Sequence, residues 1–377
     1  MKSRDGKLVL QMTEELQEAT YIDHMRLLAI DHPADVEVFS NEKVGPPEIS
    51  EYQIHTVRRR RAPVAARDKH GRDVLDEIAL ADLRFFRGFD STPRTGRVDS
   101  HYLELDLGDL GPYEQSKKIQ LVLSGYIYPV PTSVGVGLAQ NAKNPPGSPP
   151  ALWVPDALGE WREVRPFTGF PGGKNKTVVL DLSDAFLTRD YRLRIATNFE
   201  IYWDEAFFTL DESPVEVRQT PVELTRADLH FRGFSERRTS PHNGPDTYIY
   251  DVVEKRTVWL PMEGNFTRFG DVRPLLETED DQLVVFGFGD ELTLEFAELP
   301  PPPAGWKRDY ILHNVGWDKD CDPNVLLSGS VEPLPFRAMT CYPYGPDEEY
   351  PETASHRAYL KKYQTRRMDR MAFWRGR

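Results

Sequence analysis

The sequence predicts a mainly β protein made of two β-sandwich domains of the jelly-roll type. Apolar and polar residues alternate over many short stretches, which is typical of strands that bury one face. The 377 residues include 31 prolines and 26 glycines, which fit short strands joined by turns. Little of the chain follows a helical period outside one short segment in the first half and the two ends. We therefore expect packed antiparallel sheets in each domain.

The clearest alternation runs over residues 191–208, YRLRIATNFEIYWDEAFF. One parity carries the apolar side chains Leu193, Ile195, Phe199, Ile201 and Trp203, and the other carries Arg192, Arg194, Asn198, Glu200 and Asp204. This pattern predicts that Trp203 is buried and Asp204 is exposed. The run is longer than a usual strand of roughly five or six residues, so we expect a bend near residues 197–198.

Strand and turn signals divide the chain into four parts. We expect an N-terminal strand-rich segment over 1–80, a β-sandwich over 81–212, a second β-rich domain over 213–345 and a basic tail over 346–377. Strands are expected at 7–12, 20–30, 34–39, 52–57, 101–107, 119–123, 153–154, 176–182, 247–253, 282–286 and 291–296.

Several shorter segments complete this outline. Residues 13–28 include a predicted strand, with a helical turn as the alternative, and 73–83 predict a short helix. The motif ADLRFFRGF at 81–89 returns as ADLHFRGF at 227–234, either as a structural repeat or as a chance match. The proline-rich stretches 144–150 and 300–303 predict a loop and a stiff link, because proline lacks the amide donor that a ladder needs.

The charge of the chain is uneven. The net charge is −13, but residues 356–377 hold eight Lys and Arg residues against one acid, which gives +7 there and −20 elsewhere. The strongly negative net charge of residues 1–355 argues against nucleic-acid binding, because a protein needs a basic face to bind phosphates. The tail, by contrast, predicts contact with an acidic partner.

Two cysteines, Cys321 and Cys341, are too few for a disulfide framework, and one bridge or two free buried thiols are both open. No run of about 18 apolar residues occurs, so we expect no transmembrane segment. The first residues lack the apolar region of a signal peptide.

The chain resembles a known family through several motifs taken together. They include HPAD at 32–35, GFPGGK at 169–174, TNFEIYWD at 197–204, GWKRD at 305–309, GWDKD at 316–320 and PLPF at 333–336. In these it resembles the C-terminal region of bacterial FG-GAP-repeat proteins with an ASPIC/UnbV domain, the cartilage-acidic-protein-like family. The FG-GAP and ASPIC parts are missing from this sequence. The resemblance implies a fold neighbourhood and an extracytoplasmic, periplasmic location, in conflict with the missing signal peptide, and it implies no catalytic residues.

The strongest candidate binding feature is the polar face at the end of the long alternating run. Asn198, Glu200, Tyr202 and Asp204 fall on one strand face beside Trp203. Aromatic platforms with planar polar groups bind carbohydrate, so a glycan site is one interpretation. A solvent-facing strand stabilised by cross-strand pairs is the alternative, and the one we favour.

Other constellations indicate no metal, no cofactor and no catalytic residue. Residues 318–324 place oxygens at alternate positions, but Pro323 and Gly329 stand where a calcium loop needs Gly and a bidentate acid. His24 and His32 match no zinc spacing. Residues 58–61, RRRR, are expected to form a solvated loop, with a phosphate or acidic-partner site as the alternative. No nucleotide-binding or nucleophile motif is present.

The basic tail predicts a docking element. Its candidate residues are Lys361, Lys362, Arg366, Arg367, Arg370 and Trp374. The alternative is that the tail folds back on the acidic surface of its own chain.

These observations predict a non-enzymatic interaction or scaffolding protein. We expect an accessory subunit of a larger assembly that contacts other protein subunits, with peripheral contact to an anionic surface or to a membrane-bound energy-converting complex as one form. A carbohydrate-binding module is the second hypothesis. A hydrolase with a site scattered over loops is the third.

Overall fold

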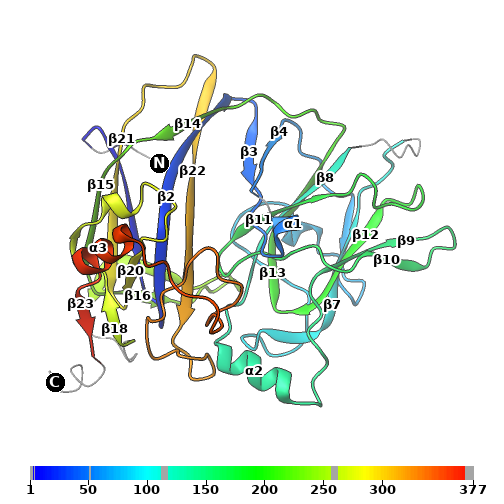
Figure 1. Ribbon diagram of the computed structural model, residues 1–377. Coiled ribbons are helices and arrows are strands. Elements are labelled where there is room, and N and C mark those ends of the chain that lie inside the picture. Colours follow the sequence, from blue (N-terminus) through cyan, green and yellow to red (C-terminus); the bar gives the residue numbers. More distant parts are fainter. Residues whose placement is uncertain (1–2, 4, 51, 112–117, 256–261, 370–377) are drawn as a thin grey trace. The chain divides into compact units, whose positions relative to one another are not determined.

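The computed structural model describes residues 3, 5–50, 52–111, 118–255 and 262–369. The protein contains 44% strand and 8% helix, and its strands form several antiparallel sheets, which confirms the prediction of a mainly β fold (Figure 1). The chain forms two compact units. Unit 1 contains Met1–Pro33, Val217–Arg237 and Tyr248–Arg377, and unit 2 contains Ala34–Glu216 and Arg238–Thr247. This division differs from the predicted boundaries, because neither the first 80 residues nor the tail stands apart.

Unit 2 is built from two sheets that share one core. The first sheet has the order β10 (Trp161–Arg165), β9 (Ala151–Pro155), β12 (Arg192–Phe199), β7 (Arg97–Asp106) and β5 (Ala65–Arg67). The second has the order β11 (Lys176–Asp181), β8 (Ile119–Ile127), β13 (Ile201–Leu210) and β6 (Phe86–Arg87). Leu105 and Ile195 from the first sheet pack with Leu121, Leu180 and Trp203 from the second. This is the packing expected of a β-sandwich.

The long alternating run is two strands in two different sheets. It breaks at Glu200, between β12 and β13, close to the predicted bend. The burial of Trp203 is confirmed, at 4% exposed, but the predicted exposure of Asp204 is wrong, because this residue is fully buried.

The sheet that contains β13 is covered on both faces, and this explains the error at Asp204. Val57 of β4 (Ile54–Val57) and Phe39 of β3 (Glu37–Ser40) pack with Phe207, away from the main core. A register shift between Trp203 and Glu205 further breaks the alternation. Alternation along the sequence predicts which side chains face solvent only where one face of the strand is exposed to solvent.

Unit 1 also contains two larger sheets around a shared core. One has the order β1 (Lys7–Thr13), β21 (Asp290–Ala297), β15 (Leu224–Phe231) and β19 (Gly270–Asp271). The other has the order β14 (Arg218–Val222), β2 (Glu18–Pro33) and β20 (Val284–Gly287), with β22 (Trp306–Asp320) also paired to β2. Leu8 and Leu294 from the first sheet pack with Leu27 and Phe286 from the second.

The ladder between β2 and β22 was not predicted at this length. It is antiparallel and pairs Glu18 with Asp320 at one end and Pro33 with Trp306 at the other. The alternative of a helical turn within residues 13–28 is therefore wrong. The two copies of the repeated motif also differ, since Ala227 to Phe231 lies inside β15 whereas residues 81–85 form a loop before β6.

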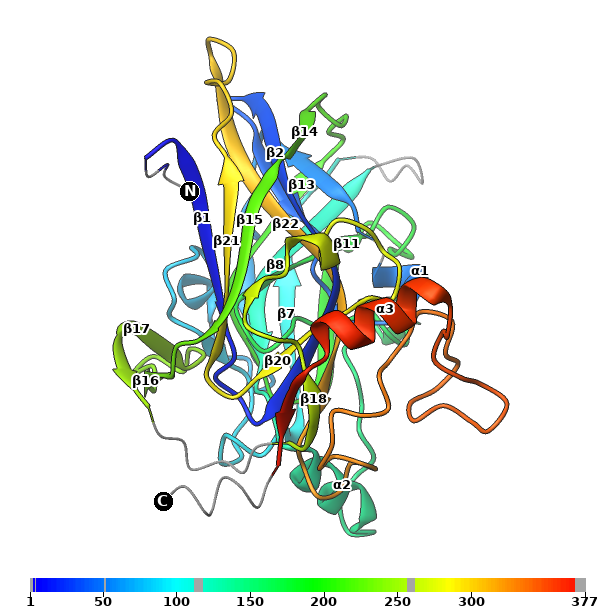
Figure 2. The same cartoon turned by 60° about the vertical axis from the view of Figure 1, so that its left-hand side comes forward.

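The remaining elements are short. The predicted helix at 73–83 is reduced to a 3₁₀ turn, η1 (Leu75–Glu77). The others are α1 (Pro47–Ser50), α2 (Thr132–Gln140), η2 (Arg273–Leu275), α3 (Ala354–Tyr363), the paired strands β16 (Phe234–Arg238) and β17 (Thr247–Glu254), and β18 (Gly264–Phe266), which pairs with β23 (Arg366–Met368) (Figure 2). Cys321 is buried and Cys341 is exposed, and no disulfide bond joins them.

Candidate functional site

The four residues of the predicted polar face all lie inside unit 2. Asn198 and Tyr202 are 2% and 3% exposed, and Glu200 and Asp204 are fully buried. The prediction of a solvent-facing strand is therefore wrong for this cluster. Buried polar groups require partners, so the hydrogen bonds of each residue show what it does.

Glu200 holds the loop that precedes β7. Its carboxylate accepts hydrogen bonds from the backbone amides of Arg94, Thr95 and Gly96 at 2.5, 2.8 and 2.8 Å. It also accepts the hydroxyl of Tyr202 at 2.6 Å. Arg94 and Gly96 have φ values of 72° and 74°, so the loop adopts left-handed backbone that needs such support. Glu200 is thus a clamp on this loop.

Asn198 performs the same task for the predicted proline-rich loop. Its side-chain oxygen accepts the amide of Ser148 at 2.7 Å, and its side-chain nitrogen donates to the carbonyl of Pro146 at 2.8 Å. Asp204 accepts the amide of Leu83 and the side-chain amide of Asn175, both at 2.9 Å. Burial raises the pKa of Asp204 above its ordinary value.

The aromatic residues near this cluster are packed against one another. Tyr202 stacks on Tyr126 with ring centroids 5.0 Å apart and an interplanar angle of 9°, and Phe89 meets Tyr202 edge-on at 5.4 Å. Burial is the main cause that raises the pKa of Tyr202. These rings form a small core and present no exposed platform for a sugar ring.

The predicted docking tail is anchored in unit 1 for most of its described length. Helix α3 buries Tyr359 and Tyr363 in the same core as β2 and β21. Gln364 donates to the carbonyl of Leu283 at 2.9 Å. The guanidinium of Arg366 pairs with the buried carboxylate of Asp290 at 2.6 Å, so Arg366 is part of the fold and not a free docking residue.

Lys361, Lys362 and Arg367 are exposed. Arg370 and Trp374 lie outside the described residues.

The arginine run at 58–61 is only partly the solvated loop that its sequence predicts. Arg60 pairs with Glu37 at 2.5 Å and with the buried Glu205 at 2.6 Å, and its guanidinium carbon lies 4.3 Å from the ring centroid of Phe207. Arg58 pairs with Asp35 at 3.4 Å. Two of the four arginines are therefore engaged within unit 2.

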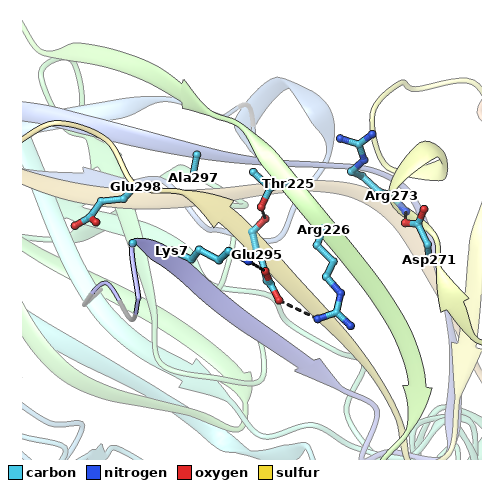
Figure 3. A pocket seen from close by; sticks show the side chains of 9 residues that line it. Lys7, Thr225, Arg226, Asp271, Arg273, Glu295, Ala297 and Glu298 are labelled. Atoms are coloured by element: carbon cyan, nitrogen blue, oxygen red, sulfur yellow. Dashed lines mark hydrogen bonds and ion pairs between the residues drawn. The ribbon is translucent and has the colours of Figure 1, made fainter.

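One hollow in unit 1 has matched charges. It occupies about 690 Å³ beside β1, β15 and β21. Three cations and three carboxylates line it: Lys7, Arg226, Arg273, Asp271, Glu295 and Glu298. Figure 3 shows Glu295 between Lys7 and Arg226, which it contacts at 2.5 and 2.9 Å. Because these charges neutralise one another locally, the hollow offers a charged ligand little advantage.

Two negative findings concern the described residues alone. Within them, no group of three or more His, Cys, Asp or Glu side chains is arranged to hold a metal ion. In the same part of the chain, no helix has the length and apolar character needed to span a membrane. Residues 318–320, the start of the calcium-like pattern, lie within β22 and not in a loop.

Comparison of the chain with protein-family models, with curated proteins and with solved structures found no match.

Proposed function

We propose that this chain is a non-enzymatic interaction protein, an accessory subunit that docks on an acidic surface of another protein. The docking face consists of Arg357, Lys361, Lys362 and Arg367, which α3 and β23 present to solvent. The proposal rests mainly on one observation: α3 exposes basic side chains to solvent while its opposite side is buried in the core of unit 1.

The anchoring fixes the docking face before a partner arrives. The hydroxyl of Thr353 caps the start of α3 by accepting the amide of His356, and Tyr359 donates to the carbonyl of Leu283 at 2.7 Å. Charges on an already ordered helix lose less conformational entropy on binding than charges on a flexible tail. The docking face therefore favours specific recognition.

No internal carboxylate neutralises this face within the described part of the chain. Arg357 donates to the backbone carbonyl of Glu352, and Lys362 lies 4.7 Å from the ring centroid of Tyr363. Neither Lys361 nor Arg367 forms an ion pair among the described residues. In a chain with a net charge of −13, four exposed cations on neighbouring parts of the sequence, without a carboxylate partner among the described residues, form a recognition feature for an acidic partner.

Charge reversal tests the proposal better than deletion, because deletion also removes Tyr359 and Tyr363 from the core. We expect the triple variant Lys361→Glu, Lys362→Glu and Arg367→Glu to unfold at an unchanged temperature. Its retention in the native assembly, measured by co-purification from the native host, should fall by about 10- to 100-fold. Salt near 1 M should weaken wild-type retention, because the screening length drops to about 3 Å.

The matched control reverses three exposed cations elsewhere, Arg84→Glu, Lys143→Glu and Arg189→Glu, and should retain the partner. If the triple variant at α3 and β23 is fully folded and co-purifies as wild type does, the docking proposal is wrong.

A further inference from the structure

A second hollow, within unit 2, has a different electrostatic character from the one in Figure 3. It occupies about 370 Å³, in the range of small-molecule sites, and lies between α1, β4, β8 and β11. Its walls combine polar donors with apolar side chains, among them Lys43, His55, Lys118, Gln120, Arg165 and Phe167. We call it the β4–β11 hollow.

The two lysines that line the β4–β11 hollow, Lys43 and Lys118, are not paired with a carboxylate within the described part of the chain. The ammonium of Lys43 donates to the backbone carbonyl of Val179 at 3.3 Å and forms no ion pair among the described residues. The side chain of Lys118 likewise has no partner in that part of the chain. The carboxylates that line the hollow, Glu48 and Asp181, are both exposed, and Asp181 accepts the amide of Ser183 at 2.9 Å.

His55, which also lines the hollow, carries a buried ring nitrogen without a hydrogen-bond partner among the described residues. The side-chain nitrogen of Gln120 donates to His55 Nδ1 at 3.5 Å, which leaves the ring proton of the neutral imidazole on Nε2. His55 Nε2 is buried and has no hydrogen-bond partner among the described residues. A buried donor without an acceptor is unusual in a folded protein and indicates a missing partner.

The pKa shifts agree with an excess of positive charge near the partly buried Lys43 and His55. Burial lowers the pKa of Lys43, and the nearby Arg165 lowers it further. Burial also lowers the pKa of His55, and Lys43 and Lys118 lower it further, while the carboxylate of Asp181 partly opposes this effect. An anion placed among these groups would favour their protonated forms and raise both pKa values.

We propose that the β4–β11 hollow binds a small organic phosphate or sulfate monoester. Lysine ammonium groups bind phosphate as point charges, and two of them, Lys43 and Lys118, line this hollow. The guanidinium of Arg165 is already held by the carboxylate of Asp184 and the carbonyl of Asp181. The hollow is also larger than an inorganic ion requires, and Phe167 and Ile49 offer apolar contact to an organic body.

This site does not depend on the docking face of α3, so either proposal stands if the other fails. Its residues come from five separate elements and loops between Asn41 and Asp181, and no motif in the sequence joins them.

Titration of the full chain with phenyl phosphate, phenyl sulfate, inorganic phosphate and benzoate tests the proposal. Calorimetry should show saturable binding of one phenyl ester, at least about tenfold tighter than inorganic phosphate or benzoate. Whether the phosphate or the sulfate ester binds more tightly identifies the head group. Bound ligand should raise the pKa of His55, followed by its imidazole resonances in an NMR pH titration.

Variants separate this site from a non-specific effect of charge. Lys43→Met and Lys118→Met should each lower the affinity for the preferred ester by about tenfold or more, whereas the exposed control Lys143→Met should leave it unchanged. The use of two variants guards against the loss of fold in one of them. No binding at millimolar ester, binding that both variants leave unchanged, or tighter binding of benzoate would each overturn the proposal.

Discussion

Replacing Glu200 with alanine is expected to lower the free energy of unfolding by about 3–5 kcal/mol. The change removes the acceptor for three backbone amides, those of Arg94, Thr95 and Gly96, and for the hydroxyl of Tyr202. The loop is also closely packed at Gly96, where an added Cβ would lie 2.1 Å from a methyl of Val130. We therefore expect the amides to lose their partner without a substitute.

Urea unfolding followed by circular dichroism measures this effect. Glu200→Gln keeps one acceptor oxygen and should fall between wild type and Glu200→Ala. Glu163, an exposed carboxylate on β10, supplies the control substitution Glu163→Ala, which should change stability by less than about 0.5 kcal/mol. A loss below about 1 kcal/mol for Glu200→Ala would show that water replaces the carboxylate and that the clamp is unimportant.

The strands were predictable wherever one face is buried and the other is exposed. In β7, Leu103 and Leu105 point to the core while Tyr102 and Glu104 are only partly covered, so the alternation is visible in the sequence. In β13 the same rule failed at Asp204, because loops and the β3–β4 pair cover the second face. Burial on that side depends on segments that are distant in the sequence, such as Leu83, which is 121 residues from Asp204, and local periodicity does not record them.

The functional groups were less predictable than the strands. The sequence predicts Glu200 as a binding residue, but three of its partners are backbone amides. Almost every residue has a backbone amide, so the residue types in the sequence do not reveal such partners. The β4–β11 hollow was missed because Lys43, His55 and Lys118 meet only when β4, β8 and β11 come together. The tail was recognised by its charge, whereas the anchoring of Tyr359 and Tyr363 depends on the core of unit 1.

The variant Glu14→Gln is expected to stabilise the protein at alkaline pH. Glu14 lies between β1 and β2, 6% exposed, and burial together with Glu18 raises its pKa to about 8. Glu18 has its own pKa raised to about 7, by burial and by Asp318 and Asp320 across the β2–β22 ladder. Four carboxylates thus share this end of the ladder.

The hydrogen bonds support a protonated Glu14. The hydroxyl of Thr20 lies 2.7 Å from a carboxylate oxygen of Glu14 and 2.9 Å from one of Asp318. One hydroxyl proton cannot serve both oxygens. If Glu14 carries a proton, it donates to Thr20, and Thr20 donates to Asp318.

The direction of the pH effect follows from the raised pKa. Between about pH 4.5 and 8 the folded chain keeps a proton on Glu14 that the unfolded chain has released, so the free energy of unfolding falls as the pH rises. Each pKa unit corresponds to about 1.36 kcal/mol. Because Glu14 and Glu18 are coupled, we expect a total near 2–4 kcal/mol and not the full sum of both shifts.

Comparison of wild type with Glu14→Gln isolates the contribution of Glu14 together with its coupling to Glu18, since titrating groups outside this cluster affect both proteins equally. Urea unfolding near pH 5 should give similar stabilities, and near pH 9 the variant should be more stable by about 2–4 kcal/mol. Glu298→Gln, which removes an exposed carboxylate away from this cluster, is the matched control. If the difference between wild type and Glu14→Gln is the same at both pH values, Glu14 is ionised throughout the range. Thr20 must then bridge two charged carboxylates.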